Sequence, residues 1–127
     1  MTNTSILIVE DEGLIALHLM ETLANAGFEV REPVPSGEEA LRHVERVPRP
    51  DLILMDITLD GQLDGIETAS RIRTRYDIPV IFLTAHSNDT IMNRAKDASP
   101  CGYILKPVIE KDLLAHVEKA LNKSKLK

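Results

Sequence analysis

The chain has 127 residues, 43% of them hydrophobic and 28% charged, which is the size and composition of one globular domain rather than of a disordered segment. Its 15 Lys and Arg residues and 20 Asp and Glu residues give a formal charge of −5, which argues against a broad nucleic-acid interface. No apolar run approaches the roughly 18–20 residues of a membrane span, and a lone cysteine, Cys101, excludes an internal disulfide.

The first half of the chain alternates between short strand patterns and longer helix patterns. Residues 6–9 are apolar at every position, as expected of a strand covered on both faces, and a helical stripe follows over residues 14–26. Residues 28–31 predict a short second strand. Ser36 and Glu39 have the spacing of a capping box, and the apolar stripe of the helix that they open extends to Val47.

The second half repeats the alternation, with strands predicted over residues 52–55, 80–83 and 103–105. Asp64 has the position of a helix N-cap, and we expect this role rather than metal binding. The next helix, opened by Ser87 or Asn88 and ending near Ala98, has few apolar positions and is predicted to be the most weakly anchored. The last helix is predicted over residues 111–122.

These elements predict an α/β domain with a five-stranded parallel sheet covered by helices on both faces. Five strand–helix units account for residues 1–122, and the Lys-rich residues 123–127 are expected to be a tail or the start of a linker. We therefore expect a stand-alone domain. The single cysteine agrees with a reducing, cytoplasmic setting.

Polar residues follow the predicted strands at the point where each strand ends. Glu10 and Asp11 follow the first strand, and Asp56, Thr84 and Lys106 follow the third, fourth and fifth. Because the carboxyl ends of parallel strands meet at one edge of the sheet, where ligands bind, we expect three carboxylates to converge in one cleft. Such carboxylates repel one another unless a cation holds them together.

A divalent cation with oxygen ligands, Mg²⁺, suits this set of acids, and Mg²⁺ usually keeps positions for water and phosphate oxygens. In such a site Lys106 can contribute a positive charge to a bound phosphate and Thr84 a hydrogen bond. Asp56 is then placed as a nucleophile, because carboxylates are known phosphoryl acceptors.

With Tyr103 and Pro107 added to these residues, the chain resembles the response regulator receiver domains of two-component signalling over nearly its whole length. The resemblance implies a flavodoxin-like three-layer fold with strand order 2-1-3-4-5. It implies that Asp11, Asp56 and the backbone carbonyl of Thr58 bind Mg²⁺, or Mn²⁺ in its place, while Glu10 acts through water. It also implies a cis peptide bond between Lys106 and Pro107.

The same resemblance implies that a sensor histidine kinase is the phosphodonor and that the domain is a signalling module rather than an enzyme, although it assists its own phosphorylation and dephosphorylation. Thr84 and Tyr103 would act as a switch that alters the surface of the fourth helix, fifth strand and fifth helix. An unidentified protein partner, or a second copy in a homodimer, would bind this surface. Neither nucleic acid nor a membrane is expected as a partner.

Two departures from the family pattern concern the site. Gly65 lies nine positions after Asp56, one more than the commonest family spacing, and Leu59 and Asp60 replace the usual Met-Pro. The second departure is Glu10, at a position where the family also frequently has Asp. Thr58 and His86, two positions after Asp56 and Thr84, are predicted to tune how readily water attacks the acyl phosphate.

The same residues can also be compared with the requirements of two other functions. A phosphatase that forms an aspartyl phosphate on a related fold would require an acid/base carboxylate two positions after the nucleophile, where this chain has Thr58. A flavin-binding electron carrier would require an anion-binding loop rich in Ser, Thr and Gly after the first strand, where this chain has acids. The phosphatase is the alternative to the receiver domain.

Overall fold

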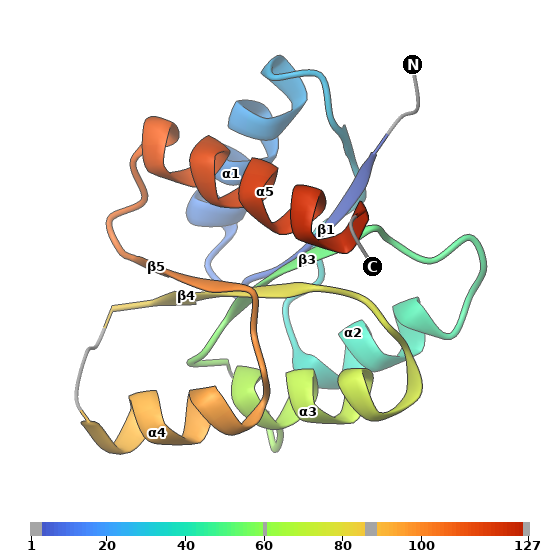
Figure 1. The fold of residues 1–127 in the computed structure, drawn as a ribbon, viewed down its shortest axis with the longest axis vertical. Coiled ribbons are helices and arrows are strands. Elements are labelled where there is room, and N and C mark those ends of the chain that lie inside the picture. The colour runs from blue at the N-terminus through green and yellow to red at the C-terminus, as the bar shows by residue number, and fades with distance from the viewer. Residues whose placement is uncertain (1–3, 60, 86–88, 126–127) are drawn as a thin grey trace.

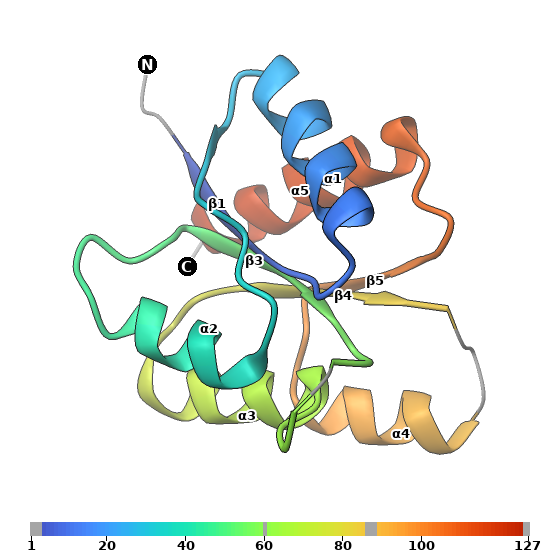
Figure 2. The same cartoon turned by 180° about the vertical axis from the view of Figure 1, so that it is seen from behind.

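The computed structural model describes residues 4–59, 61–85 and 89–125, and these residues form a parallel sheet between two layers of helices (Figures 1 and 2). The elements in chain order are β1 (Ser5–Val9), α1 (Gly13–Asn25), β2 (Glu29–Val30), α2 (Gly37–Val44), β3 (Leu52–Asp56), α3 (Gly65–Arg75), β4 (Val80–Thr84), α4 (Asp89–Asp97), β5 (Gly102–Leu105) and α5 (Glu110–Lys125). The strand order is β2-β1-β3-β4-β5, which confirms the predicted fold.

The central strands β1, β3 and β4 are buried along their whole length, because helices cover both faces of the sheet. Alternate residues contribute to two separate cores. In β1, Leu7 and Val9 pack on the side of α2, α3 and α4, whereas Ile6 and Ile8 pack on the side of α1 and α5. This two-sided burial is the physical reason that the strands are apolar at every position.

The predicted helix signals have the expected geometry. The Ser36 hydroxyl accepts a hydrogen bond from the Glu39 backbone N–H at 3.2 Å at the start of α2, and the Asp64 carboxylate accepts one from the Glu67 N–H at 2.8 Å at the start of α3. Gly27, just past α1, has φ of 98°, a conformation that favours glycine. Asp64 is therefore an N-cap, as predicted.

The ends of α2 and β2 differ from the prediction. The second helix ends at Val44 and does not continue to Val47, whose side chain is 74% exposed. The side chain of Arg49 folds back and donates from Nε to the Val44 carbonyl at 2.8 Å, which satisfies a carbonyl that the helix leaves open. The second strand has only two residues, and the chain rejoins β1 through an isolated bridge between Val9 and Val34.

Differences also occur in the C-terminal third. Helix α5 continues to Lys125, so the residues expected to form a tail after Asn122 begin as helix. Helix α4 has Ala95 as its only buried residue, in agreement with the predicted weak anchoring. The predicted caps of α4, Ser87 and Asn88, lie outside the described residues. None of the helices among the described residues is long and apolar enough to cross a membrane.

Candidate functional site

The polar residues that end the strands meet at one edge of the sheet. Asp56 and Thr84 are the last residues of β3 and β4, and Glu10 and Lys106 directly follow β1 and β5. Parallel pairing aligns these strand ends, with Asp56 opposite Leu83 on β4, and the Lys106 N–H donates to the Thr84 carbonyl at 2.8 Å. The structure thus gathers the four strand ends that the sequence predicted to form a site.

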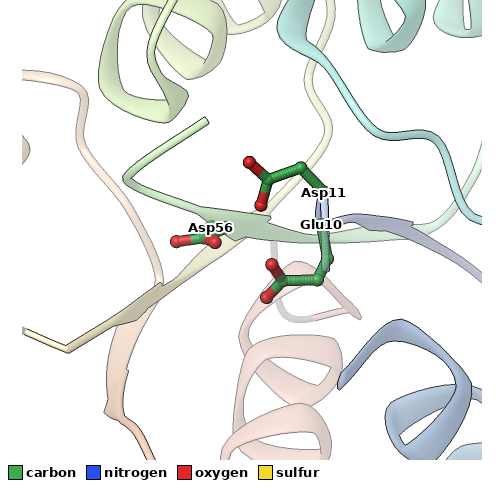
Figure 3. A group of neighbouring side chains, drawn as sticks. All are labelled: Glu10, Asp11 and Asp56. Atoms are coloured by element: carbon green, nitrogen blue, oxygen red, sulfur yellow. The ribbon is translucent and has the colours of Figure 1, made fainter. Parts of the chain in front are cut away.

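Three carboxylates come together at the ends of β1 and β3, as Figure 3 shows. Glu10, Asp11 and Asp56 each offer a carboxylate oxygen, and these oxygens lie within 4.8 Å of one another. Glu10 and Asp56 are almost fully buried, with 3% and 4% of their surfaces exposed, whereas Asp11 is partly exposed. The cluster therefore has a buried base and a side that solvent reaches.

Lys106 is the cation that two of these carboxylates share. Its Nζ lies 2.8 Å from Oε1 of Glu10 and donates a hydrogen bond to Oδ2 of Asp56 at 3.0 Å. Burial alone would lower the pKa of Lys106, but the contacts with Glu10 and Asp56 outweigh it and raise the pKa above 10.5. Lys106 is therefore positively charged at neutral pH.

Glu10 is the carboxylate whose protonation is most altered. Removal from water and the neighbouring Asp56 raise its pKa to about 7, although Lys106 and the backbone N–H of Glu12, which donates to Oε2 at 3.2 Å, act in the opposite direction. Burial is the larger cause, and together with the adjacent Asp56 it keeps a proton on Glu10 more firmly than on an ordinary glutamate.

The same residues fit a magnesium ion. Although Oε1 of Glu10 is close to Lys106, it is buried and accepts no hydrogen bond from the residues that the structure describes. An additional cation would neutralise the excess charge of Glu10, Asp11 and Asp56, and carboxylate oxygens are the ligands that Mg²⁺ takes in proteins. The backbone of Thr58 is held beside them, because its N–H donates to Oδ1 of Asp56 at 3.1 Å.

Thr84 and Tyr103 lie on neighbouring strands near this cluster. Thr84 is 2% exposed at the end of β4. Tyr103 pairs with Phe82 across β4 and β5, with ring centroids 6.2 Å apart, and burial raises the pKa of its phenol. Thr84 pairs with Leu105, so the two residues predicted to form the switch stand diagonally across the strand pair.

The peptide bond between Lys106 and Pro107 is cis, as the sequence resemblance implied. A second cis bond, between Val47 and Pro48, was not predicted. His86, which was predicted to tune hydrolysis, lies outside the described residues.

The loop between Asp56 and α3 is anchored at both ends by backbone hydrogen bonds. The Ile57 N–H donates to the Leu83 carbonyl at 3.0 Å, and the Gly65 N–H donates to the Ile57 carbonyl at 2.9 Å. Leu59, which replaces a residue of the usual Met-Pro pair, is 8% exposed and packs into the core on the side of α3. Burial of this side chain holds the first part of the loop against the core.

Two features of the loop were not predicted from the sequence. A Cβ atom on Gly65 would overlap the carbonyl oxygen of Asp56, so α3 begins in direct contact with the backbone of the site. Asp64 also forms an ion pair of 2.8 Å with Arg94 of α4, thirty positions later in the chain. A glycine directly after an N-cap was a visible signal for the first feature, but no sequence pattern pointed to the second.

Comparison with known proteins gives a family match over most of the chain. The model of the response regulator receiver domain matches residues 6–118. The chain is 36% identical over 118 residues to the transcriptional regulatory protein PdtaR of Mycobacterium tuberculosis, a match that covers 93% of this chain and 57% of that protein. It is 40% identical to the positive alginate biosynthesis regulatory protein of Pseudomonas aeruginosa, over 91% of this chain and 46% of that protein. The chain thus spans about half the length of these curated relatives.

Solved structures give the same match in three dimensions. The signal receiver domain of a modulated diguanylate cyclase from Desulfovibrio desulfuricans superposes with a TM-score of 0.92 at 40% identity, and the match covers 98% of both chains. A CheY-like receiver domain protein from Methanospirillum hungatei superposes with a TM-score of 0.88 at 27% identity, over 98% of both chains.

Proposed function

The chain belongs to the response regulator receiver domain family of two-component signalling, and from that premise we propose that Asp56 accepts a phosphoryl group from the phosphohistidine of a sensor histidine kinase. The observation that carries this assignment is the position of Asp56. Its carboxylate is buried, contacts Nζ of Lys106 at 3.0 Å, and lies in a cluster with two other carboxylates.

The proposed reaction is an in-line transfer. An oxygen of the Asp56 carboxylate attacks phosphorus, the P–N bond to the histidine breaks, and the leaving imidazole keeps the bonding electron pair and takes up a proton. The Thr58 N–H orients the carboxylate through Oδ1, and Lys106 brings its positive charge to the oxygens of the transferring group. Thr84 supplies a hydroxyl for the phosphoryl oxygens.

We assign Mg²⁺, or Mn²⁺ in its place, to Asp11, Asp56 and the backbone carbonyl of Thr58, with Glu10 acting through water. When bound, the ion supplies positive charge that offsets the negative charge of the phosphoryl oxygens. The protein itself contributes the burial and the preformed acid cluster that make this charge effective.

The signal is proposed to leave through the surface formed by α4, β5 and α5. Movement of Thr84 toward the phosphoryl group would leave space that Tyr103 can enter, and α4, with one buried residue, is the element that can shift at low cost. Leu105 and Ile109, 59% and 60% exposed, give the end of β5 an apolar surface for a protein partner or a second copy of the chain. We place this exchange in the cytoplasm, in agreement with the single cysteine.

The test is phosphorylation of the purified protein with acetyl phosphate and Mg²⁺, followed by mapping of the acid-labile group by mass spectrometry. We expect one phosphoryl group per chain on Asp56 and none in Asp56→Asn. Asp77→Asn, which removes an exposed carboxylate after α3, is the matched control and keeps full labelling. Equal labelling of Asp56→Asn would overturn the assignment.

The same experiment separates a receiver domain from an aspartyl-phosphate phosphatase. A receiver domain accumulates a stoichiometric product, whereas a phosphatase turns over a generic phosphate ester many times per chain. Thr58 and His86 are the proposed modulators of hydrolysis, so Thr58→Ala and His86→Ala are expected to change the half-life of the phosphorylated form. Unchanged half-lives would exclude that role.

A further inference from the structure

The basic residues of the chain are divided by type along the sequence. Six of the eight arginines lie within residues 42–49 and 71–75, whereas all seven lysines lie at position 96 or later. Residues 41–51 and 67–77 together contain these six arginines and four carboxylates, a local charge of +2 in a chain of −5. A planar guanidinium with several fixed donors suits paired contacts with carboxylates better than lysine does.

The fold brings the two arginine-rich segments together. Helices α2 and α3 lie side by side, and their carboxyl ends lie at the edge of the sheet where β3 and β4 begin, opposite the acid cluster at the strand ends (Figure 1). The guanidinium of Arg49, which follows α2, stacks 4.3 Å from the ring centre of Tyr76, which follows α3. This contact joins the two segments into one preformed surface.

Three of the six arginines have partners within this surface. Arg49 donates to the Val44 carbonyl, Arg73 lies 3.9 Å from Asp77, and Arg71 lies 3.4 Å from Glu67 in a pair that is half exposed on both sides. Exposed pairs of this kind contribute little to stability, so Arg71 can exchange its partner at low cost.

The other three arginines are Arg42, Arg46 and Arg75. All three are exposed, and among the residues that the structure describes no carboxylate forms an ion pair with them. Basic residues in the last turn of a helix stabilise the helix dipole, which accounts for Arg42 and Arg75 in part. It does not account for Arg46, which lies beyond the last turn of α2.

A cavity of about 290 Å³ opens between the two helix ends. It is lined by Leu41, Glu45, Arg71, Thr74, Arg75 and Tyr76. Leu41 and Tyr76, both half-buried, contribute apolar surface to the cavity, whereas the other four lining residues are exposed and polar or charged. A cavity with both apolar and charged lining can hold an apolar side chain and the neighbouring carboxylates of a short peptide.

We infer that this surface, formed by the carboxyl ends of α2 and α3, docks an acidic segment of a partner protein, with an apolar side chain in the cavity and carboxylates on Arg42, Arg46 and Arg75. Three acids, Glu45, Glu67 and Asp77, lie among these arginines. A peptide can space its carboxylates so that they contact the arginines and avoid the acids. A nucleic-acid backbone carries closely and evenly spaced phosphates and would meet those acids directly. The occupant is therefore an acidic protein segment.

The test uses a fluorescein-labelled peptide in which Asp and Glu alternate with Leu, and fluorescence anisotropy at low ionic strength. We expect the variant with Arg42→Gln, Arg46→Gln and Arg75→Gln to bind about tenfold more weakly than the wild type, since three exposed charge pairs with the peptide are lost. The matched control carries Lys123→Gln, Lys125→Gln and Lys127→Gln, which removes the same charge from the last residues of the sequence and leaves the affinity unchanged.

Two further ligands complete the experiment. The same peptide with Asn and Gln in place of the acids is expected not to bind, and a single-stranded oligonucleotide of equal charge is expected to bind more weakly than the acidic peptide. Equal affinity of the arginine variant and the wild type would overturn the assignment, as would binding of the neutral peptide. Tighter, arginine-dependent binding of the oligonucleotide would replace the acidic partner with a nucleic acid. Matching unfolding midpoints show that both triple variants are folded.

Discussion

Gly65 touches the backbone carbonyl of Asp56, so closely that any Cβ atom at position 65 would overlap the carbonyl oxygen. The first residue of α3 therefore packs directly against the end of β3, where the proposed phosphoacceptor lies. Since the neighbour is backbone rather than a flexible side chain, the contact cannot relax by a change of rotamer.

Gly65→Ala is therefore expected to lower the free energy of unfolding by about 1–3 kcal/mol, the usual cost of overpacking, and to reduce the extent of phosphorylation. Gly13→Ala is the control, because a Cβ at Gly13 meets no atom within 4 Å and alanine favours a helix. Urea unfolding and acetyl phosphate labelling measure the two effects. Equal behaviour of the two variants would show that β3 can shift without loss.

Removal of the ammonium at Lys106 leaves two buried carboxylates without their shared cation. In metal-free buffer at pH 8 we expect Lys106→Met to lower the free energy of unfolding by about 3 kcal/mol, because Glu10 and Asp56 then repel each other without a shared cation and the pKa of Glu10, which Lys106 lowers, rises further. Addition of Asp56→Asn to this variant is expected to restore part of the loss. Urea unfolding in the presence of EDTA measures both changes.

Lys119→Met on the exposed face of α5 is the control and should change stability by less than about 0.5 kcal/mol. Mg²⁺ is expected to stabilise Lys106→Met more than the wild type, because the variant has more uncompensated negative charge. A variant as stable as the wild type without metal would mean that Glu10 and Asp56 do not depend on Lys106.

His43 provides a pH dependence that is separate from the acid cluster. Burial, then the nearby Arg31 and Arg46, lower its pKa below the ordinary 6.5, and its Nε2 lies 3.2 Å from Nη1 of Arg31, which donates to the neutral ring. Because the folded state disfavours the protonated ring, the stability that His43 contributes is present above pH 6.5 and is lost as the pH falls below it.

We expect His43→Gln to flatten the decline of stability below pH 6.5, with a change in slope of at most about 1.4 kcal/mol per pH unit, the limit for one proton. Urea unfolding at a series of pH values gives the slope. His18→Gln on the exposed face of α1 should leave the slope as in the wild type. An equal slope in His43→Gln would assign the acid sensitivity to other groups.

The ion pair between Asp64 and Arg94 connects the loop after Asp56 with α4. Because the pair is exposed, Arg94→Gln should change the global stability by about 0.2–1 kcal/mol at most, but α4 has one buried residue and few other attachments. We therefore expect amide hydrogen exchange in α4 to become several-fold faster while α5 is unchanged. Lys96→Gln removes the same charge from the same helix without breaking the pair, and equal exchange in both variants would contradict the role of Arg94.

The sequence predicted the elements best where every residue of an element is buried. The central strands were predicted closely because two-sided burial makes residues 6–9, 52–55 and 80–83 apolar throughout. The strand order came from the family resemblance. The predicted end of α2 was wrong, because the apolar stripe to Val47 does not show whether its last residue is buried. In the structure the helix ends at Val44, whose carbonyl accepts a hydrogen bond from the side chain of Arg49.

The proximity of Glu10, Asp11, Asp56 and Lys106 was predicted from the sequence, but their individual contacts were not. The approach of Glu10, Asp56 and Lys106 followed from the rule that parallel strands end at one edge of the sheet. The sequence led us to expect Lys106 to contact a bound phosphate. In the structure its ammonium contacts the carboxylates of Glu10 and Asp56. The ion pair of Asp64 with Arg94 and the stacking of Arg49 on Tyr76 depend on how helices sit beside one another, which the periodicity of a single helix does not encode.

The brevity of β2 has a consequence for association between copies of the protein. Its two residues, Glu29 and Val30, form the free edge of the sheet next to β1, and Glu29 is exposed. A sheet can be extended by another chain only where a run of backbone N–H and C=O groups is open, and a charged, two-residue border offers almost none. At this edge of the sheet, therefore, another chain finds little backbone to pair with, and the apolar strand β1 lies behind β2 rather than at the border.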